Sequence, residues 1–250
     1  MKQLLWKNLW QSLAAIVFLI VVWVIAYFAV GNPLLIPPFS ESMKEVGDLL
    51  LGKAFWIGFG MSLLRAWIAF ILSFALAAIF AVIAYLYPSL SGFLAPIVSA
   101  FRSLPILAVL LILLSFLGNG KAPVVVAFLS LFPMLYTGIL AALSGVDKHL
   151  IEVSRVQGTP LFRRVSAIYL PLSSPYILRE ASGALSFSVK LVVSAEVLAY
   201  TAQSLGGMMQ DARMYNLPQL FALVGVSFLA GLIVELAVSL LATVAENKIR

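Results

Sequence analysis

The 250-residue chain contains no cysteine and a single histidine. Without cysteine it forms no disulfide and offers no thiol for catalysis or metal binding. Charged residues are also scarce for a chain of this length. They make up 10% of the chain, whereas an average soluble domain has about 25%. So few charges cannot cover the water-facing surface of a soluble protein of this size, and a soluble fold is therefore excluded.

The sequence also lacks the patterns of a nucleotide site or an enzyme active site. No GxxxxGK[ST] phosphate loop is present, so the chain does not bind ATP by that route. Neither a carboxylate pair nor a Ser-His-Asp set stands out, and the lone His149 has no partners at metal-ligand spacing. We therefore expect no catalytic residue, metal or cofactor in this chain.

Apolar residues, by contrast, make up 63% of the chain, and the mean hydropathy is +1.09. A helix needs about 20 apolar residues to cross a membrane core of about 30 Å. On this basis we predict a single-domain, all-α membrane protein over residues 1–250 with six transmembrane helices. The predicted spans are 13–30, 66–86, 93–117, 123–143, 177–198 and 217–244.

The third span is the least obvious. The run from Leu104 to Leu117 is too short to cross at about 1.5 Å per residue, so the span must begin near Phe93. This start places Arg102 inside the membrane, beside a kink at Pro105.

The distribution of basic residues predicts the orientation. With the N-terminus in the cytoplasm, inner segments hold nine basic residues and outer segments hold four, as the positive-inside rule requires. The net charge of +6 therefore reports orientation and does not indicate nucleic-acid binding. The inner set is Lys2, Lys7, Lys148, Arg155, Arg163, Arg164, Arg179, Lys248 and Arg250, and the outer set is Lys44, Lys53, Lys121 and Arg213.

The charged residues of predicted spans that could line a substrate pathway are Arg102, Lys190, Glu196 and Glu235. Charges at membrane depth are costly and mark substrate pathways or pair with one another. Two cations near mid-depth, Arg102 and Lys190, favour an anionic solute. The alternative is structural pairing, with Glu196 or Glu235 as the partner of Lys190. Arg65, at the edge of the second span, is expected to be an interfacial anchor only.

The segment from Ile151 to Pro171 differs from the apolar chain around it, with one acid and three arginines. We predict two short helices, the first over 151–157. Gly158 ends it in a left-handed conformation, and Pro171 ends the second helix. By periodicity alone, an amphipathic helix at the lipid surface explains the segment equally well.

The register of the segment favours a more specific interpretation. The motif positions are Glu152, Gly158, Ile168, Leu170 and Pro171. Their spacing resembles the E-A-A-x-x-x-G-x9-I-x-L-P motif of ABC importer permeases, with Val153 and Ser154 in place of the two alanines. SLLRAWIAF, FRSLPILA with LGNG, SAEVLA and SLGGMMQDAR resemble landmarks of the nitrate, sulfonate, taurine and bicarbonate group of these permeases. The SLGG stretch itself is interpreted as a turn.

The resemblance implies a permease subunit whose coupling helices, in a cytoplasmic loop of about 145–172 between the fourth and fifth spans, sit in a cleft of an ABC ATPase. That ATPase dimer would bind ATP and Mg, while two permease copies and an extracytoplasmic solute-binding protein complete an importer in the bacterial cytoplasmic (inner) membrane. Two other classes stay open. An ion-coupled secondary transporter would use Glu196 or Glu235 and predicts inverted repeats, which the sequence does not show. A non-transporting assembly factor would need no charges inside the membrane.

Overall fold

The computed structural model describes the backbone of residues 2–249 and the side chains of residues 14 and 16–238, apart from those at 148 and 161. Five residues that enter the predicted charge bias have side chains outside this set: Lys2, Lys7, Lys148, Lys248 and Arg250. The side chains of residues 13, 15 and 239–244, in the first and last predicted spans, also lie outside it.

Every regular element in the described range is helical. The elements are α1 (Lys2–Val30), α2 (Phe39–Leu51), α3 (Lys53–Leu86), α4 (Pro88–Ser103), α5 (Ile106–Ser144), α6 (Lys148–Val156), α7 (Leu161–Arg164), the π turn η1 (Val165–Tyr169), α8 (Leu170–Ala199), α9 (Leu205–Tyr215) and α10 (Leu217–Ile249).

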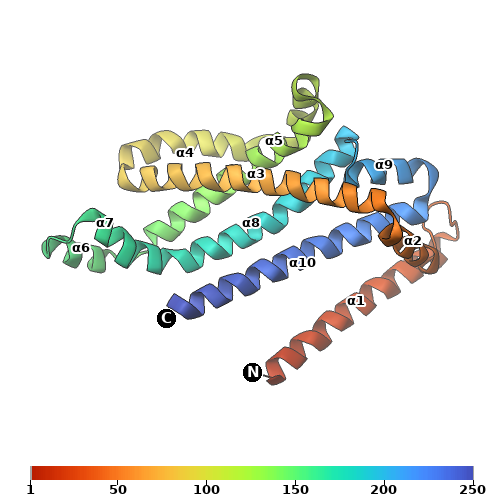
Figure 1. Ribbon diagram of the computed structural model, residues 1–250, viewed down its shortest axis with the longest axis horizontal. Coiled ribbons are helices and arrows are strands. Elements are labelled where there is room, and N and C mark those ends of the chain that lie inside the picture. Colours follow the sequence, from red (N-terminus) through yellow and green to blue (C-terminus); the bar gives the residue numbers. More distant parts are fainter. Residues whose placement is uncertain (1, 250) are drawn as a thin grey trace.

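The long helices run between two ends of an elongated molecule. Helices α6 and α7 lie at one end, and α2 and α9 lie at the other, with α3, α8 and α10 extending between them (Figure 1). The N-terminus of α1 and the C-terminus of α10 both lie away from the α2–α9 end (Figure 1).

The core lies where α3 packs on α5 and α8. Helix α3 contributes a stripe of small, fully buried side chains, Ala66, Ser73, Ala77 and Ala81, spaced by four and seven residues. Residues spaced in this way share one helix face. Small side chains let helix backbones approach closely, which is how transmembrane helices associate when lipid removes the hydrophobic driving force.

Four described helical stretches are long and apolar enough to cross a membrane: Lys53–Leu86, Ile106–Ser144, Phe162–Ala199 and Leu217–Val238. Ile16–Val30 is a shorter apolar stretch. Many large apolar side chains on these helices stay exposed, including Ile71, Ile79 and Leu111. An apolar surface of this extent suits contact with lipid. The predicted all-α membrane class is therefore confirmed.

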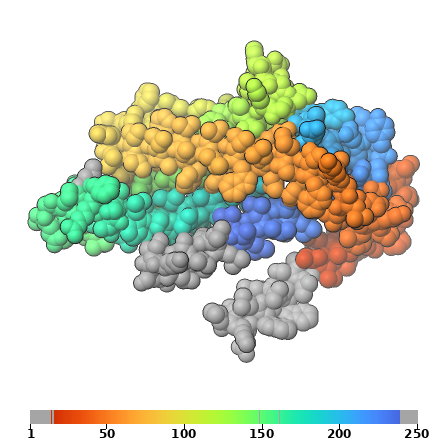
Figure 2. All heavy atoms as spheres, in the orientation of Figure 1, coloured from red at the N-terminus to blue at the C-terminus, as the bar shows by residue number. Residues whose placement is uncertain are grey.

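The helix boundaries differ from those predicted between residues 93 and 143. The predicted third span is divided, because α4 ends at Ser103 and α5 begins at Ile106. Leu104 is extended, as a residue before proline tends to be. Helix α5 is broken at Gly118 (φ 69°, ψ 176°), and this part of the chain projects from the molecule (Figure 2). Arg102 lies in the last turn of α4, beside the predicted kink at Pro105.

A second correction concerns Pro171, which does not end a helix. The chain stays helical from α7 through η1 into α8, with Pro171 and Pro175 inside the helical run. In the π turn the N–H of Leu170 donates to the carbonyl of Val165, five residues back. Proline has no backbone N–H to donate to the preceding turn. The wider π turn directly before Pro171 accommodates this missing hydrogen bond, and the helix continues past the proline.

Candidate functional site

Gly158 sets the angle between α6 and α7. Its φ of +68° is left-handed, as the sequence predicts. The N–H of Gly158 donates to the carbonyl of Arg155 (2.9 Å) and the N–H of Thr159 donates to the carbonyl of Ser154 (3.0 Å). This pair of bonds is a Schellman ending, which satisfies the last carbonyls of α6 and turns the chain sharply. The two short helices are therefore held in a defined hairpin.

A small apolar cluster attaches this hairpin to the rest of the molecule. Ile151 of α6, Tyr169 of η1 and Val146 are buried together, with Ile168 packed beside them. The Tyr169 ring meets Tyr85, near the end of α3, edge to face at 5.5 Å, and the two hydroxyls lie 3.4 Å apart. The hairpin thus contacts α3 through Tyr85 and continues into α8.

The exposed residues of the hairpin include large apolar side chains beside charged ones such as Arg155 and Arg163. Val153, Val156 and Phe162 are 55%, 89% and 85% exposed, and Glu152 is exposed among them. Ser154, in contrast, is buried and its hydroxyl donates to the carbonyl of Ile151 (2.7 Å). Of the two residues that replace alanines, Ser154 therefore faces the molecule and Val153 faces outward. We name the exposed set Glu152, Val153, Val156 and Phe162 the docking surface. Figure 2 shows the hairpin at one end of the molecule.

Near the other end, a buried ion pair joins three helices. The guanidinium of Arg65 (α3) donates to the carboxylate of Glu196 (α8) at 2.9 Å, and the two side chains are 11% and 0% exposed. The Ser62 hydroxyl donates to the other carboxylate oxygen at 2.6 Å. The Leu205 N–H at the start of α9 donates to the Ser62 hydroxyl oxygen at 2.9 Å. Arg65 is therefore not an interfacial anchor, and Glu196 is the partner of Arg65 rather than of Lys190.

The glycines of SLGG begin a helix and do not form a simple turn. Ser204 caps α9 by accepting a hydrogen bond from the N–H of Gly207. A Cβ at Gly206 would lie 2.4 Å from the Glu196 Cβ and 2.4 Å from the Val197 nitrogen. Gly206 therefore needs glycine because α9 lies directly on the end of α8, and Gly207 needs it because a Cβ there would meet the carbonyl of Thr201 in the connection between them.

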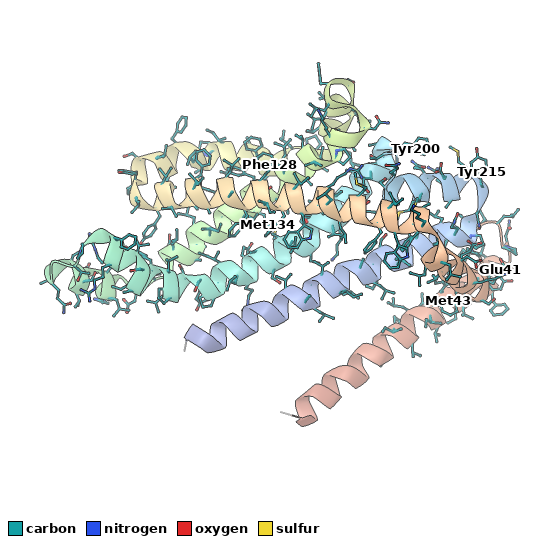
Figure 3. The ribbon with its side chains drawn as sticks, viewed as in Figure 1. Glu41, Met43, Phe128, Met134, Tyr200 and Tyr215 are labelled. Atoms are coloured by element: carbon teal, nitrogen blue, oxygen red, sulfur yellow. The ribbon has the colours of Figure 1, made fainter. Side chains whose placement is uncertain are left out.

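A second contact between α8 and α9 is a hydrogen bond outside the spanning helices. Tyr200, the left-handed cap of α8, donates from its hydroxyl to Asp211 of α9. This hydrogen bond and the charge of Asp211 raise the pKa of the Tyr200 hydroxyl. Tyr200 and Tyr215 lie at the end of the molecule formed by α9 (Figure 3).

Arg102 faces cavities between α4, α5 and α8. One, of about 470 Å³, is lined by Arg102, Ser130, Thr137 and Glu180 together with apolar side chains that include Met134; Met134 is labelled in Figure 3. Arg102 and Thr137 also line a cavity of about 430 Å³ between α4 and α5. Glu180 lines a third, of about 600 Å³, which reaches Asp147 and Leu150 beside α6.

Lys190 lies on the side of α8 that faces α10, and Glu235 lies on α10 itself. The Cε of Lys190 would lie 3.5 Å from a Cβ built at Gly231. Glu235 accepts a hydrogen bond from the Ser186 hydroxyl at 3.1 Å. Neither residue lines the cavity that holds Arg102 and Glu180. The structure thus does not bring Arg102 and Lys190 together.

Residues 73–249 match the family described as the inner membrane component of binding-protein-dependent transport systems. The chain belongs to that family. It is a permease component of an ABC transport system, as the motif from Glu152 to Pro171 predicts. The match is to the family as a whole and not to its nitrate, sulfonate, taurine and bicarbonate group. No curated protein matches the chain.

Solved structures support the permease fold. A chain of an amino acid ABC transporter crystallised with histidines is 17% identical, with a TM-score of 0.64, over 78% of this permease and 94% of that chain. A methionine ABC transporter in an inward-facing conformation is 20% identical, with a TM-score of 0.64, over 76% and 96%. A bacterial alginate ABC transporter, in complex with a periplasmic protein that holds an alginate pentasaccharide, is 14% identical, with a TM-score of 0.63, over 94% and 93%.

Sequence reasoning missed two features of the permease. Glu180 lies beside Arg179, four residues into the predicted fifth span, so it resembles an ordinary boundary charge. Ser62 lies outside the predicted second span and carries no charge. Within the described residues, no group of three or more His, Cys, Asp or Glu side chains is placed to hold a metal ion.

Proposed function

We propose that this permease forms the translocation pathway of an ABC importer in the bacterial cytoplasmic membrane. Two copies would work as a homodimer with a dimer of ABC ATPase subunits, which bind ATP and Mg, and with an extracytoplasmic solute-binding protein. The similar structures are of amino acid, methionine and alginate ABC transporters, the last in complex with a periplasmic protein. The proposal extends that arrangement to this chain.

The docking surface is the observation that carries the proposal. Several large apolar side chains exposed together on a hairpin at one end of the molecule favour a binding surface, because water solvates them poorly. Val156 and Phe162 are almost fully exposed, while Gly158 and the Ile151–Tyr169 cluster hold the hairpin rigid. A short amphipathic helix of this kind fits a groove in a soluble protein. The motif residues Glu152, Gly158, Ile168, Leu170 and Pro171 would then build the coupling site.

Helix continuity supplies a mechanism for coupling. The helical run from Phe162 to Ala199 has 38 residues, which is about 57 Å at 1.5 Å per residue. Phe162 of the docking surface lies at one end of this run. Near the other end, Glu196 accepts hydrogen bonds from Arg65 and Ser62 of α3 and from the Gly206 N–H of α9. Closure of the ATPase dimer would move Phe162, and the continuous helix would carry that movement to the Arg65–Glu196 pair and to α9. The pathway would thereby switch between its outward and inward openings.

The proposed topology has six spans and cytoplasmic termini. The spans would be α1, α3, α4 with the first part of α5, the rest of α5 beyond Gly118, α8 and α10. Support comes from the position of α6 and α7 at one end of the molecule and of α2 and α9 at the other. The cytoplasmic side would be the α6–α7 end.

We also propose that the solute is small and bears an anionic group. The support is Arg102, which faces a cavity of about 470 Å³, within the size range of small-molecule sites of about 300–1,000 Å³. The test of the whole proposal is uptake into proteoliposomes. The permease should transport only when the ATPase subunit, ATP and the binding protein are present. Uptake by the permease alone, driven by an ion gradient in vesicles without ATP, would show a secondary transporter instead.

A further inference from the structure

The cavity between α4, α5 and α8 combines charges of both signs. The guanidinium of Arg102 and the carboxylate of Glu180 line the same space of about 470 Å³. Ser130 and Thr137 of α5 add hydroxyls, and Phe187 and Leu191 of α8 form an apolar wall. A cavity that combines apolar walls with a few polar groups is typical of a site for a small ligand.

The chain makes room for the Glu180 side chain. A Cβ at Gly138 would lie 2.3 Å from the Glu180 Cγ and 2.9 Å from its Oε1. The carboxyl group therefore occupies the space over α5 that any other residue at position 138 would fill. Glycine at this position lets the acid lie against α5, at the junction of the 470 Å³ cavity and the 600 Å³ cavity that reaches toward α6.

Neither charge has a salt-bridge partner among the side chains that the structure describes. Among the side chains that the structure describes, Arg65–Glu196 is the only ion pair. Arg102 and Glu180 thus face the cavity without a salt bridge to another residue. Charges within spanning helices are costly unless they meet an opposite charge or line a pathway.

We propose that this cavity binds a zwitterion, with the anionic group of the solute on Arg102 and its cationic group on Glu180. The proposal rests on the function proposed above. It narrows the class of solute from anions to zwitterions, because Glu180 would repel a purely anionic solute. One solute carrying both charges neutralises both side chains at once. Hydrogen bonds to charged groups are the strong ones, so each side chain should select for its part of the solute.

The experiment compares solutes that differ only in the cationic group. Two pairs serve: taurine with isethionate, and β-alanine with 3-hydroxypropionate. In each pair an ammonium replaces a hydroxyl on the same skeleton. Binding of each radiolabelled solute is measured on the complex of the permease with its ATPase subunit, without the binding protein, so that only the membrane site selects.

We expect the ammonium member of at least one pair to bind about tenfold more tightly, which is the effect of one charge-assisted hydrogen bond. Glu180→Gln should abolish this preference, whereas Arg102→Gln should weaken both members of the pair. Gly138→Ala should act like Glu180→Gln, because the Glu180 side chain from Cγ outward would have to leave this position. Glu41→Gln and Arg213→Gln, which change exposed charges on α2 and α9, are the controls and should leave binding unchanged.

Several results would overturn the proposal. With the wild-type permease, these are equal binding of both members of each solute pair, or binding of neither pair. With the variants, they are a preference for the ammonium member that survives Glu180→Gln, or one that is lost through Lys190→Gln instead. ATP-driven uptake, measured in parallel, separates this failure from a failure of the proposed function. Retained uptake without ammonium selection contradicts the zwitterion site alone. Failure of the ATPase to associate contradicts the importer.

Discussion

The guanidinium of Arg65 and the carboxylate of Glu196 lie 2.9 Å apart, with the Glu196 side chain fully buried. They are 131 residues apart in sequence, and their contact joins α3 to α8. Through Ser62 the same network reaches the first N–H of α9. The end of the permease opposite the docking surface is therefore held by a charged network as well as by apolar packing.

Removing one partner of this ion pair should destabilise the permease more than removing both partners. Arg65→Leu or Glu196→Leu leaves one buried charge without its partner, which costs about 3–5 kcal/mol. The double variant removes both charges and should recover much of this loss. Thermal unfolding of the four proteins in detergent gives the comparison. If the two single losses simply add in the double variant, the side chains are not coupled.

Gly206→Ala should detach α9 from α8. The new methyl group would lie 2.4 Å from the Val197 backbone nitrogen, and backbone cannot move aside as a side chain can. Overpacking of this kind costs about 1–3 kcal/mol. Gly183→Ala on α8 is the control, because a Cβ there meets nothing within 4 Å. Similar melting temperatures for the two variants would show that the close contact is unimportant.

Gly158→Val should uncouple ATP hydrolysis from transport. A Cβ at position 158 meets no neighbour, but its φ of +68° is unfavourable for every residue except glycine and worst for a β-branched one. The angle of the α6–α7 hairpin should change while the spanning helices remain folded. The measurement is the amount of solute transported per ATP hydrolysed. Gly47→Val on α2, with equal space and no left-handed φ, should leave this ratio close to the wild-type value.

Tyr200 should lose its proton at a higher pH than an ordinary tyrosine. Asp211 raises the pKa of the Tyr200 hydroxyl, so the neutral, donating form persists above the ordinary pKa. The α8–α9 contact that it makes is thus fully present below about pH 10 and is lost only as the pH rises through the raised value. Difference absorbance between wild type and Tyr200→Phe follows this titration. Asp211→Asn should shift it to lower pH, and an unchanged titration would contradict the assignment.

The sequence could predict the features that depend on local pattern. Apolar runs predict the helices, and the spacing from Glu152 to Pro171 predicts the hairpin and the left-handed Gly158. Glycine and proline act on their own neighbours, so their effects are visible in a short window. Even there, Pro171 misleads, because no local pattern indicates the π turn that lies before it.

The features that depend on distant partners could not be predicted. Arg65 looks like an interfacial anchor until Glu196 is placed beside it. Likewise, Gly138 looks like any helical glycine until Glu180 fills the space above it. The cavity around Arg102 requires α4, α5 and α8 to be packed together, which span lengths and charges alone do not specify.

The docking surface is the central claim, and its most direct test is association with the ATPase subunit. Val156→Ser and Phe162→Ser together remove two apolar side chains that are 89% and 85% exposed, so the fold should not change. Co-purification of the ATPase from detergent extract is the measurement, with Phe116→Ser, 81% exposed on α5, as the matched control. The account predicts that the docking variant loses the ATPase while the control retains it. An ATPase that stays bound to the docking variant as firmly as to wild type would contradict the account.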